Sequence, residues 1–232
     1  NNLTDRIGDF GYAFLKINTN TDINEEENIV DVVFVVNKGR RVYVNRVEIS
    51  GNTRTRDNVI RREVSMGEGK LFSASQLRKS KSKINGLDFF ETVSVSTPSS
   101  SDPEKVDVKI EVEEKPTGSF TIGAGYSSAD AFMGTASVSQ KNFLGKGQTL
   151  GFSFAISANT TNYNLSLTEP YFLGKNLSAG FDLYNKKTEP TDSSSYETNT
   201  VGAGVRLSFP ISKHLRNSVS YHISNVEVKN AG

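Results

Sequence analysis

The sequence predicts an α+β region followed by part of an antiparallel transmembrane β-barrel of about seven strands. Before residue 117, strand and helix patterns follow one another in the order β-α-α-β-β, with Lys and Glu at the outer positions. After residue 117, strands alternate apolar residues with Ser, Thr, Asn and Gly. The run Lys115-Pro116-Thr117-Gly118 separates the two patterns and predicts a domain boundary.

The composition limits the functions that the chain can have. Its net charge is +1 and its mean hydropathy is −0.42, so neither a nucleic acid nor an acidic surface is indicated as a partner. The sequence contains no cysteine, which excludes thiolate metal sites and disulfides within it. It also lacks a run of about 20 apolar residues of the kind that forms a membrane helix. A membrane barrel is compatible with this hydropathy, because half of each strand faces water.

Residues 1–38 are predicted to be the C-terminal part of a module that begins earlier. A short helix is expected over residues 3–7 and a strand over residues 12–18. A polar turn at residues 19–28 leads to the apolar run I-V-D-V-V-F-V-V at 29–36. This run predicts a strand that is buried on both faces, or an edge strand that a neighbour covers.

Residues 39–116 are predicted to form a complete module that begins with a strand over residues 42–50. Thr53 or Thr55 is expected to cap a helix that runs to about Met66. The apolar stripe of this helix is expected to contain Val59, Ile60 and Val64.

The second helix of the module has clear start and stop signals. Ser73 and Gln76 form a capping box, and Phe72 and Leu77 occupy the two positions of a hydrophobic staple. The Asn85-Gly86 pair is expected to end the helix.

Two strands close the module, over residues 89–97 and 106–112. In the second, V-D-V-K-I-E-V, apolar and charged residues alternate as expected for a half-buried strand. The run V-D-V-V-F-V-V at 30–36 has a similar form, and this repeat indicates tandem modules.

The hairpin at residues 149–169 carries the clearest membrane signal. Its first strand reads T-L-G-F-S-F-A-I-S-A, with large apolar residues at every second position and small residues between them. A soluble sandwich would usually place Lys and Glu on its outer face, whereas these positions hold mostly hydroxyl and amide groups. The pattern favours a barrel with a wet interior and a lipid-facing exterior.

The same alternation predicts the other barrel strands. The expected strands cover residues 119–127, 133–141, 149–158, 161–169, 177–185, 198–209 and 215–225. The polar faces include Asp182, Arg206 and His222, which are expected to point into the lumen. The lipid-facing positions of the first strand are expected to be Phe120, Ile122, Ala124 and Tyr126.

The connections between the barrel strands predict the orientation of the barrel. The repeated F-L-G-K at 143–146 and 172–175 is expected to form tight turns at one end, and the longest polar loop, at 186–197, lies at the other. Short turns are typical of the periplasmic side, from which the first strand rises. Seven strands leave two open edges, which hydrocarbon does not tolerate, so the sequence is expected to be a piece of a longer chain.

Several stretches of the sequence resemble the BamA family of outer-membrane protein assembly factors. They are R-V-Y-V-N-R-V-E-I-S-G-N-T at 41–53, V-I-R-R-E-V at 59–64, L-D-F-F-E-T-V at 87–93, E-E-K-P-T-G-S-F-T-I-G-A-G-Y-S at 113–127, K-N-F-L-G-K-G at 141–147 and T-E-P-Y-F-L-G-K at 168–175. The resemblance implies that residues 39–116 are the last POTRA module and that residues 1–38 end the preceding one. Residues 117–232 would then be the N-terminal part of the outer-membrane barrel.

The resemblance also implies a function in the outer membrane of a Gram-negative cell, with the POTRA modules in the periplasm. The barrel would insert nascent outer-membrane proteins, and its first strand would form one side of a lateral gate in contact with outer-membrane lipid. The gate residues would be Ser119, Phe120, Thr121, Ile122, Gly123, Ala124, Gly125 and Tyr126. The two glycines weaken the strand, although they would equally ease barrel curvature.

The POTRA modules would receive clients or accessory assembly lipoproteins. A sheet edge at residues 89–97 or 42–50 could pair with a client strand, or the sheet could serve only as a spacer. Arg61, Arg62 and Glu63 are expected on an exposed helix face and are the candidate contact for an accessory partner. The alternative for these charges is an ordinary solvated helix face.

Other functions are kept as alternatives. A related POTRA-barrel translocase, for two-partner secretion or autotransporter assembly, would share the same architecture; a passive barrel or a soluble β-rich adhesin is less favoured. The sequence predicts no enzyme and no cofactor: His222 has no metal-binding or nucleophile motif beside it, and no helix follows Gly123-Ala124-Gly125 as a dinucleotide site requires.

Overall fold

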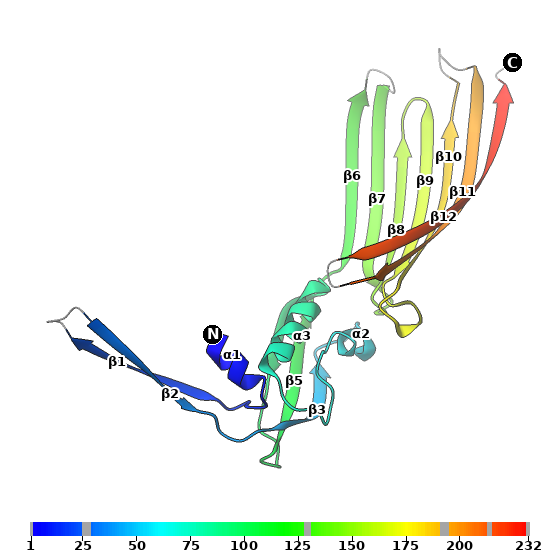
Figure 1. Ribbon diagram of the computed structural model, residues 1–232. Coiled ribbons are helices and arrows are strands. Elements are labelled where there is room, and N and C mark those ends of the chain that lie inside the picture. Colours follow the sequence, from blue (N-terminus) through cyan, green and yellow to red (C-terminus); the bar gives the residue numbers. More distant parts are fainter. Residues whose placement is uncertain (1, 25–28, 128–130, 191–194, 213–214, 231–232) are drawn as a thin grey trace. The chain divides into compact units, whose positions relative to one another are not determined.

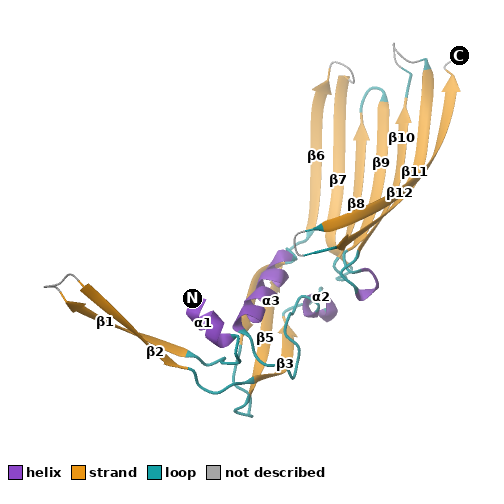
Figure 2. Ribbon diagram, viewed as in Figure 1, coloured by secondary structure: helices purple, strands orange, loops and turns teal. Residues whose placement is uncertain are grey.

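The computed structural model describes residues 2–24, 29–127, 131–190, 195–212 and 215–230 (Figure 1). The chain divides into two compact units between Lys115 and Pro116. Strands make up most of the second unit, and the described helices all lie in the first apart from one short 3-10 turn (Figure 2). Among the described helices, none has the length and apolar character needed to span a membrane.

The first unit begins with helix α1 (Asn2–Gly8) and a two-stranded antiparallel ribbon of β1 (Lys16–Asn24) and β2 (Ile29–Asn37). β1 starts later than the sequence predicted and takes up part of the expected polar turn; the rest of that turn, 25–28, lies outside the described residues. β2 is exposed along its length, so the prediction of a buried strand was wrong for the described chain. It is exposed because β2 pairs only with β1 and no described element covers either face.

The rest of the first unit has the predicted order β-α-α-β-β. Its elements are β3 (Tyr43–Ser50), α2 (Asp57–Arg61), α3 (Ala74–Gly86), β4 (Phe90–Ser96) and β5 (Lys105–Glu114). The sheet order is β3-β5-β4, with β3 parallel and β4 antiparallel to the central strand β5. Because β5 is the central strand, with a neighbour on each side, most of its residues are buried or half-buried.

The core of this module lies between the sheet and the two helices. Val106, Val108 and Ile110 of β5 are almost fully buried, as their alternation predicted. Val59 and Ile60 of α2 and Ile84 of α3 complete the same cluster. The two helices are held on the sheet mainly by burial of these apolar side chains.

The two helices match their predictions to different degrees. α3 begins as predicted, since the Ser73 hydroxyl accepts a hydrogen bond from the Gln76 N–H at 3.3 Å, and it ends at Gly86. α2 has only five residues and ends at Arg61, so the predicted helix to Met66 was wrong. Its N-cap is Arg56, which makes no side-chain capping bond. The expected cap, Thr55, lies one residue earlier, and its backbone N–H donates to the Glu114 carboxylate.

The second unit is a single antiparallel sheet of seven strands, which confirms the predicted barrel strands. Each strand pairs with its neighbour in sequence, in the order β12-β11-β10-β9-β8-β7-β6. The strands are β6 (Gly118–Ser127), β7 (Ala131–Phe143), β8 (Gln148–Ile156), β9 (Thr160–Glu169), β10 (Ser178–Thr188), β11 (Tyr196–Pro210) and β12 (Arg216–Asn230).

One row of apolar side chains crosses all seven strands of this sheet. In register order the row is Phe120, Val138, Phe152, Leu165, Leu183, Ala203 and Ile223. Because successive residues of a strand point to opposite faces, the intervening Ser, Thr, Asn and Gly residues share the other face. The sheet therefore has one apolar face and one polar face, as a lipid-exposed barrel wall requires.

The prediction of short turns at one end and the longest loop at the other was wrong, because the β9–β10 connection at 170–177 is slightly longer than the β10–β11 connection at 189–195. β10 extends to Thr188 and β11 begins at Tyr196, so these strands take up much of the expected long loop at 186–197. Residues 191–194 of that loop lie outside the described residues. The β9–β10 connection at the other end contains the 3-10 turn η1 (Phe172–Gly174). Leu173 and Gly174 have positive φ values of 56° and 70°, which let this turn reverse sharply.

Candidate functional site

β6 lies at one edge of the seven-stranded sheet. It pairs with β7 from Gly118–Gln140 to Ser127–Ala131 without a register shift, and no second described strand pairs with it. The predicted gate residues therefore all lie on a strand with one open edge. Such an edge presents a row of backbone N–H and C=O groups that another strand can pair with.

Two outward side chains of β6, those of Ile122 and Tyr126, are the most exposed large apolar residues on the described strands of the sheet. Ile122 is 71% exposed and Tyr126 is 80% exposed, whereas Phe152 in the sheet interior is 45% exposed. Neighbouring strands cover a side chain from both sides in the interior but from only one side at an edge. A strand added next to β6 would cover these side chains.

The glycines of β6 have a specific packing context. Gly123 lies opposite Thr135, and a Cβ on Gly123 would approach the Thr135 hydroxyl to 2.7 Å. Gly125 has more room, since its nearest contact would be the end of Met133 at 3.6 Å. Neither glycine has a positive φ. Gly123 therefore lets Thr135 lie close over β6 on the polar face, rather than serving a turn.

The start of β6 is fixed to β7. The Lys141 N–H donates to the Thr117 carbonyl at 3.0 Å, and the Gln140 side-chain amide donates to the Thr117 hydroxyl at 2.7 Å. These bonds tie down the first residues of β6 on the β7 side and leave its opposite edge open.

The polar face contains the three charged or titratable residues predicted for the lumen. Arg206 donates to both oxygens of Asp182, at 2.9 and 3.2 Å. His222 lies across from Gly204, where a Cβ would approach the imidazole to 2.5 Å. The small residue provides the space for the large polar side chain on the next strand. His214, the other histidine, lies outside the described residues.

The two edges of the module sheet are not equally open. The outer edge of β3 is partly covered, because Val44 exchanges hydrogen bonds with Gly69 and Lys70, and the Phe72 N–H donates to the Val42 carbonyl. β4 forms the other edge and pairs with β5 alone among the described strands. Of the two edges considered from the sequence, β4 offers the more accessible backbone.

The charged triplet after α2 does not form one exposed face, contrary to the sequence prediction. Arg61 is exposed, donating to both Asp57 oxygens at 2.7 and 3.1 Å and to the Val47 carbonyl at 3.2 Å. Arg62 is only partly exposed and Glu63 is buried. Because α2 ends at Arg61, the following residues turn in towards the module instead of continuing along a helix surface.

Glu114, the last residue of β5, organises the loop before α2. Its carboxylate accepts hydrogen bonds from the Thr53 hydroxyl and from the N–H groups of Arg54 and Thr55, at 2.8, 2.9 and 2.6 Å. Burial alone would raise the pKa of Glu114, but these hydrogen bonds outweigh it and lower the pKa below its ordinary value. The next residue, Lys115, donates to Asp88 at 2.7 Å.

Sequence reasoning missed Glu114 as a structural residue. A signal was present, because an acidic residue ends a predicted strand and a Thr-Arg-Thr loop offers donors, but nothing local joins positions about 60 apart. Within the described ranges there is no group of His, Cys, Asp and Glu residues arranged to hold a metal ion. The features that the described residues do provide include the open strand edges of β6 and β4 and an apolar face of the seven-stranded sheet.

Known proteins share both units. The model of the surface antigen variable number repeat (POTRA) matches residues 42–115, and that of the Omp85 superfamily domain matches residues 142–232. The outer membrane protein assembly factor BamA of Neisseria meningitidis is 36% identical over 92% of this chain, and that of Nitratidesulfovibrio vulgaris is 32% identical over 97%. The chain spans 28% of the length of each of these relatives.

Solved structures agree with the sequence relatives. The crystal structure of BamA from Haemophilus ducreyi lacking POTRA domains 1–3 matches 99% of this chain and 44% of that one, with a TM-score of 0.88 and 31% identity. CdiB from Escherichia coli matches 97% of this chain and 44% of its own, with a TM-score of 0.59 and 13% identity, which shows a shared fold alone.

A POTRA module joined to an antiparallel sheet with one apolar and one polar face defines an outer-membrane β-barrel protein with a periplasmic module. The chain belongs to the Omp85 superfamily, and within it resembles BamA. The first unit accordingly lies in the periplasm and the sheet in the outer membrane. Chain order then places the β7–β8, β9–β10 and β11–β12 connections on the periplasmic side, where β6 begins.

Proposed function

We propose that this chain takes part in assembling β-barrel proteins into the outer membrane. The observation that carries the proposal is an antiparallel sheet with one apolar and one polar face that directly follows a POTRA module. The names of the similar proteins in Neisseria meningitidis and Nitratidesulfovibrio vulgaris support the same function. In this proposal the clients are nascent outer-membrane proteins, and accessory lipoproteins and outer-membrane lipid are the other partners.

The proposed domain division follows the two units and the repeat in the sequence. Residues 1–38 would be the C-terminal part of one POTRA module, residues 39–116 the last module, and residues 117–232 the N-terminal part of the barrel. In this division the exposed ribbon of β1 and β2 belongs to the earlier module, whose other elements would cover its apolar side chains.

In the proposed mechanism, β6 forms one side of a lateral gate. A client strand pairs with its open edge by β-augmentation, using backbone hydrogen bonds that depend little on the client's sequence. The exposed row of Phe120, Ile122 and Tyr126 then becomes covered on its second side. This burial and the new hydrogen bonds would favour the paired state at the membrane.

Cysteine cross-linking tests the gate proposal directly, because the sequence contains no cysteine. Thr121 of β6 and Ser153 of β8 lie on the same polar face, where each is the cross-strand neighbour of Ser137 of β7. Each is replaced by cysteine in turn. Thr121 lies on the open edge, whereas Ser153 lies between paired strands. We expect Thr121→Cys to form disulfides with cysteines in the terminal strands of a client during assembly, and Ser153→Cys to form few.

The outcomes separate the candidate functions. Equal cross-linking at the two positions would contradict pairing at β6. Cross-linking of β6 to a secreted polypeptide rather than to barrel strands would instead favour a POTRA-barrel translocase, whose fold CdiB shares. If no client adduct forms at β6 while clients are still inserted, the lateral-gate proposal is wrong.

The module edge is the proposed first contact for clients. Ser94 of β4 and Glu111 of β5 are cross-strand neighbours, and both are exposed. Ser94→Cys lies on the edge strand, and Glu111→Cys lies on the central strand, so the pair distinguishes edge pairing from general surface contact. We expect client adducts mainly at Ser94→Cys; similar yields at both positions would favour the spacer role.

Arg61 is the remaining candidate contact for an accessory lipoprotein. Its neighbours Arg62 and Glu63 are turned inwards, so the proposal narrows to the exposed guanidinium and the Asp57 beside it. Arg61→Glu should reduce co-purification of accessory proteins, and Arg6→Glu on the exposed side of α1 is the matched control. Unchanged co-purification for Arg61→Glu would indicate that the surface around Arg61 is an ordinary solvated one.

A further inference from the structure

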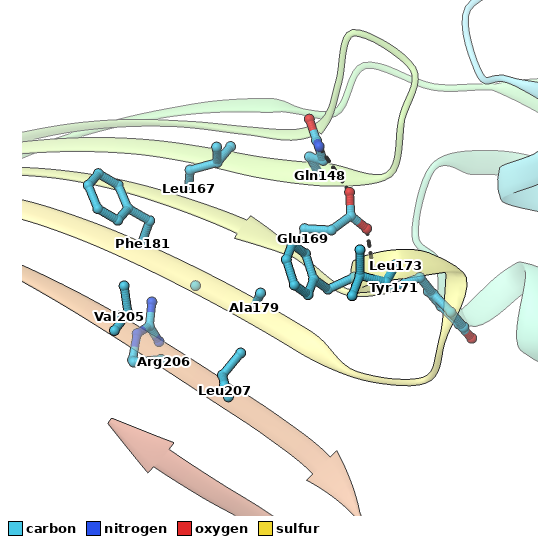
Figure 3. A pocket seen from close by; sticks show the side chains of 12 residues that line it. Gln148, Leu167, Glu169, Tyr171, Leu173, Ala179, Phe181, Val205, Arg206 and Leu207 are labelled. Carbon is cyan, nitrogen blue, oxygen red and sulfur yellow. Dashed lines mark hydrogen bonds between the residues drawn. The ribbon is translucent and has the colours of Figure 1, made fainter. Parts of the chain in front are cut away.

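A hollow of about 660 Å³ lies on the apolar side of the sheet, across β8 to β11, at the periplasmic end (Figure 3). Its floor is formed by Leu167, Phe181, Val205 and Leu207, which belong to the apolar face described above. Ala179 pairs with Glu169 on one side and with Leu207 on the other, and its small side chain leaves the middle of the hollow unfilled. The hollow is therefore continuous with the surface that faces lipid.

The wall of the hollow is the turn between β9 and β10. Phe172 and Leu173 of this turn line it, and Figure 3 shows Leu173 beside Tyr171 at the end of the strands. The Phe172 N–H donates to the Leu177 carbonyl at 2.8 Å, and the Gly174 N–H donates to the Tyr171 carbonyl at 3.0 Å. These bonds fix the turn, so the wall is part of the folded structure.

The periplasmic rim of the hollow is acidic. Glu169 accepts hydrogen bonds from the Gln148 side-chain amide and from the Tyr171 N–H, both at 2.9 Å (Figure 3). These two donors are neutral, so they orient the carboxylate without cancelling its charge. Arg206 also borders the hollow, but its side chain belongs to the polar face, where its guanidinium is paired with Asp182.

We propose that this hollow holds an acyl chain of a periplasmic-leaflet phospholipid whose head group carries a primary ammonium, as in phosphatidylethanolamine. An apolar hollow that opens on the lipid side of a barrel excludes water and is filled most readily by hydrocarbon. The carboxylate of Glu169 stands at the turn end of the strands, where aromatic side chains mark the membrane boundary and lipid head groups lie. A cationic head-group atom complements that charge, whereas an anionic lipid would meet it with repulsion.

Photolabelling of the protein in lipid vesicles tests the acyl-chain part. The probe is phosphatidylethanolamine with a diazirine on one acyl chain, in vesicles of phosphatidylethanolamine and phosphatidylglycerol, and adducts are mapped by peptide mass. We expect labelling of the peptides that carry Leu167 and Phe181 to exceed labelling around Val201, which lies on the same face outside the hollow.

A filling variant supplies the matched comparison. Ala179→Phe puts a ring on the floor of the hollow, and Ala203→Phe makes the same change on the same face in the central row. We expect Ala179→Phe to lower the local labelling at least fivefold and Ala203→Phe to leave it unchanged. Folding of each variant is checked by the mobility of the unheated protein on gels. Uniform labelling along the apolar face, insensitive to Ala179→Phe, would overturn the proposal.

The head-group part has its own test, which does not depend on filling the hollow. The same diazirine chain is carried on phosphatidylglycerol, and the ratio of labelling by the two lipids is measured for the parent protein and for Glu169→Gln. Glu227→Gln, an acidic residue near the other end of the sheet, is the control. We expect the parent and Glu227→Gln to prefer the ammonium lipid and Glu169→Gln to lose that preference. Equal labelling by both lipids in the parent would overturn the ammonium assignment.

Discussion

Thr55 donates its backbone N–H to the Glu114 carboxylate at 2.6 Å, and this bond joins the loop before α2 to the last strand of the module. The Thr53 hydroxyl and the Arg54 N–H donate to the same carboxylate. One buried side chain thus organises a loop that would otherwise expose its donors to solvent. The residues that follow Glu114 lead directly into the barrel, so this clamp fixes the end of the module.

Glu114→Gln is expected to loosen the loop. Removal of the charge weakens charge-assisted hydrogen bonds, at a cost of about 1–2 kcal/mol. Hydrogen exchange at the amides of Arg54 and Thr55 should therefore become roughly ten times faster. Glu113→Gln, at the exposed neighbouring position, is the control. Equal exchange in the two variants would contradict the clamp.

The same clamp predicts a pH dependence of its own. The folded-state pKa of Glu114 lies below its ordinary value of 4.5. The stabilisation is therefore complete above about pH 4.5 and is lost as the pH falls through the lower folded value. Exchange at Thr55, corrected for the intrinsic pH dependence, should accelerate in that acid range in the parent protein but not in Glu114→Gln. A pH-independent difference between the two would argue against the carboxylate as the cause.

Asp9 is expected to tie the N-terminal segment to α3. Its carboxylate accepts from the Ser73 hydroxyl at 2.7 Å and from the Ser75 N–H at 2.8 Å. Burial would raise the pKa of Asp9, but these bonds and the nearby Arg78 lower it. Asp9→Ala should speed exchange at Ser75 by about threefold, in line with the loss of one exposed capping group. Asp22→Ala on β1 should leave that amide unchanged.

The Tyr184–Gly202 pair on the polar face of the sheet predicts a coupled effect. A Cβ on Gly202 would lie 2.3 Å from the Tyr184 ring, so Gly202→Ala must displace that side chain. We expect it to lower barrel stability by about 1–3 kcal/mol, measured from urea unfolding on gels. Gly134→Ala, where the nearest contact would be 3.6 Å, should cost less. Tyr184→Ala should remove most of the penalty of Gly202→Ala; strict additivity would contradict direct contact.

The Asp182–Arg206 ion pair leads to a similar comparison. Asp182 is largely covered, whereas Arg206 is more exposed. Arg206→Met leaves the covered carboxylate without its bidentate partner, so it should destabilise the sheet by about 1 kcal/mol or more. The double variant Asp182→Asn with Arg206→Met should recover part of that loss. A double variant that is less stable than Arg206→Met alone would argue against this pair as the cause.

The barrel strands were predictable because their signal is local. Each strand alternates large apolar residues with small polar ones, and this two-residue period needs no knowledge of distant contacts. The start of α3 was equally predictable, since the capping box of Ser73 and Gln76 lies within four residues. The strand ends were less accurate, because β10 and β11 continue through polar residues that also suit a loop.

The mispredicted elements depend on distant contacts. Thr55 looked like a helix cap, but Arg56 occupies the cap position, and the Thr55 N–H donates to Glu114 from the far end of the module. Glu63 looked exposed because α2 was expected to continue past Arg61. The hollow at Glu169 was also beyond prediction, since it needs the turn after β9 and the register of β8 to β11 together. Its only local sign is an acidic residue at the position where the alternation expects an apolar one.

The sheet order also affects how the barrel can form. Every pairing from β6 to β12 joins strands that are adjacent in sequence, so each new strand closes only a short loop. Short loops cost little chain entropy, and such local topologies form quickly for their size. The sheet can therefore grow one hairpin at a time, each strand using the previous one as its template. In these terms β6 is the first template of the sheet, because β7 and every later strand add on its other side.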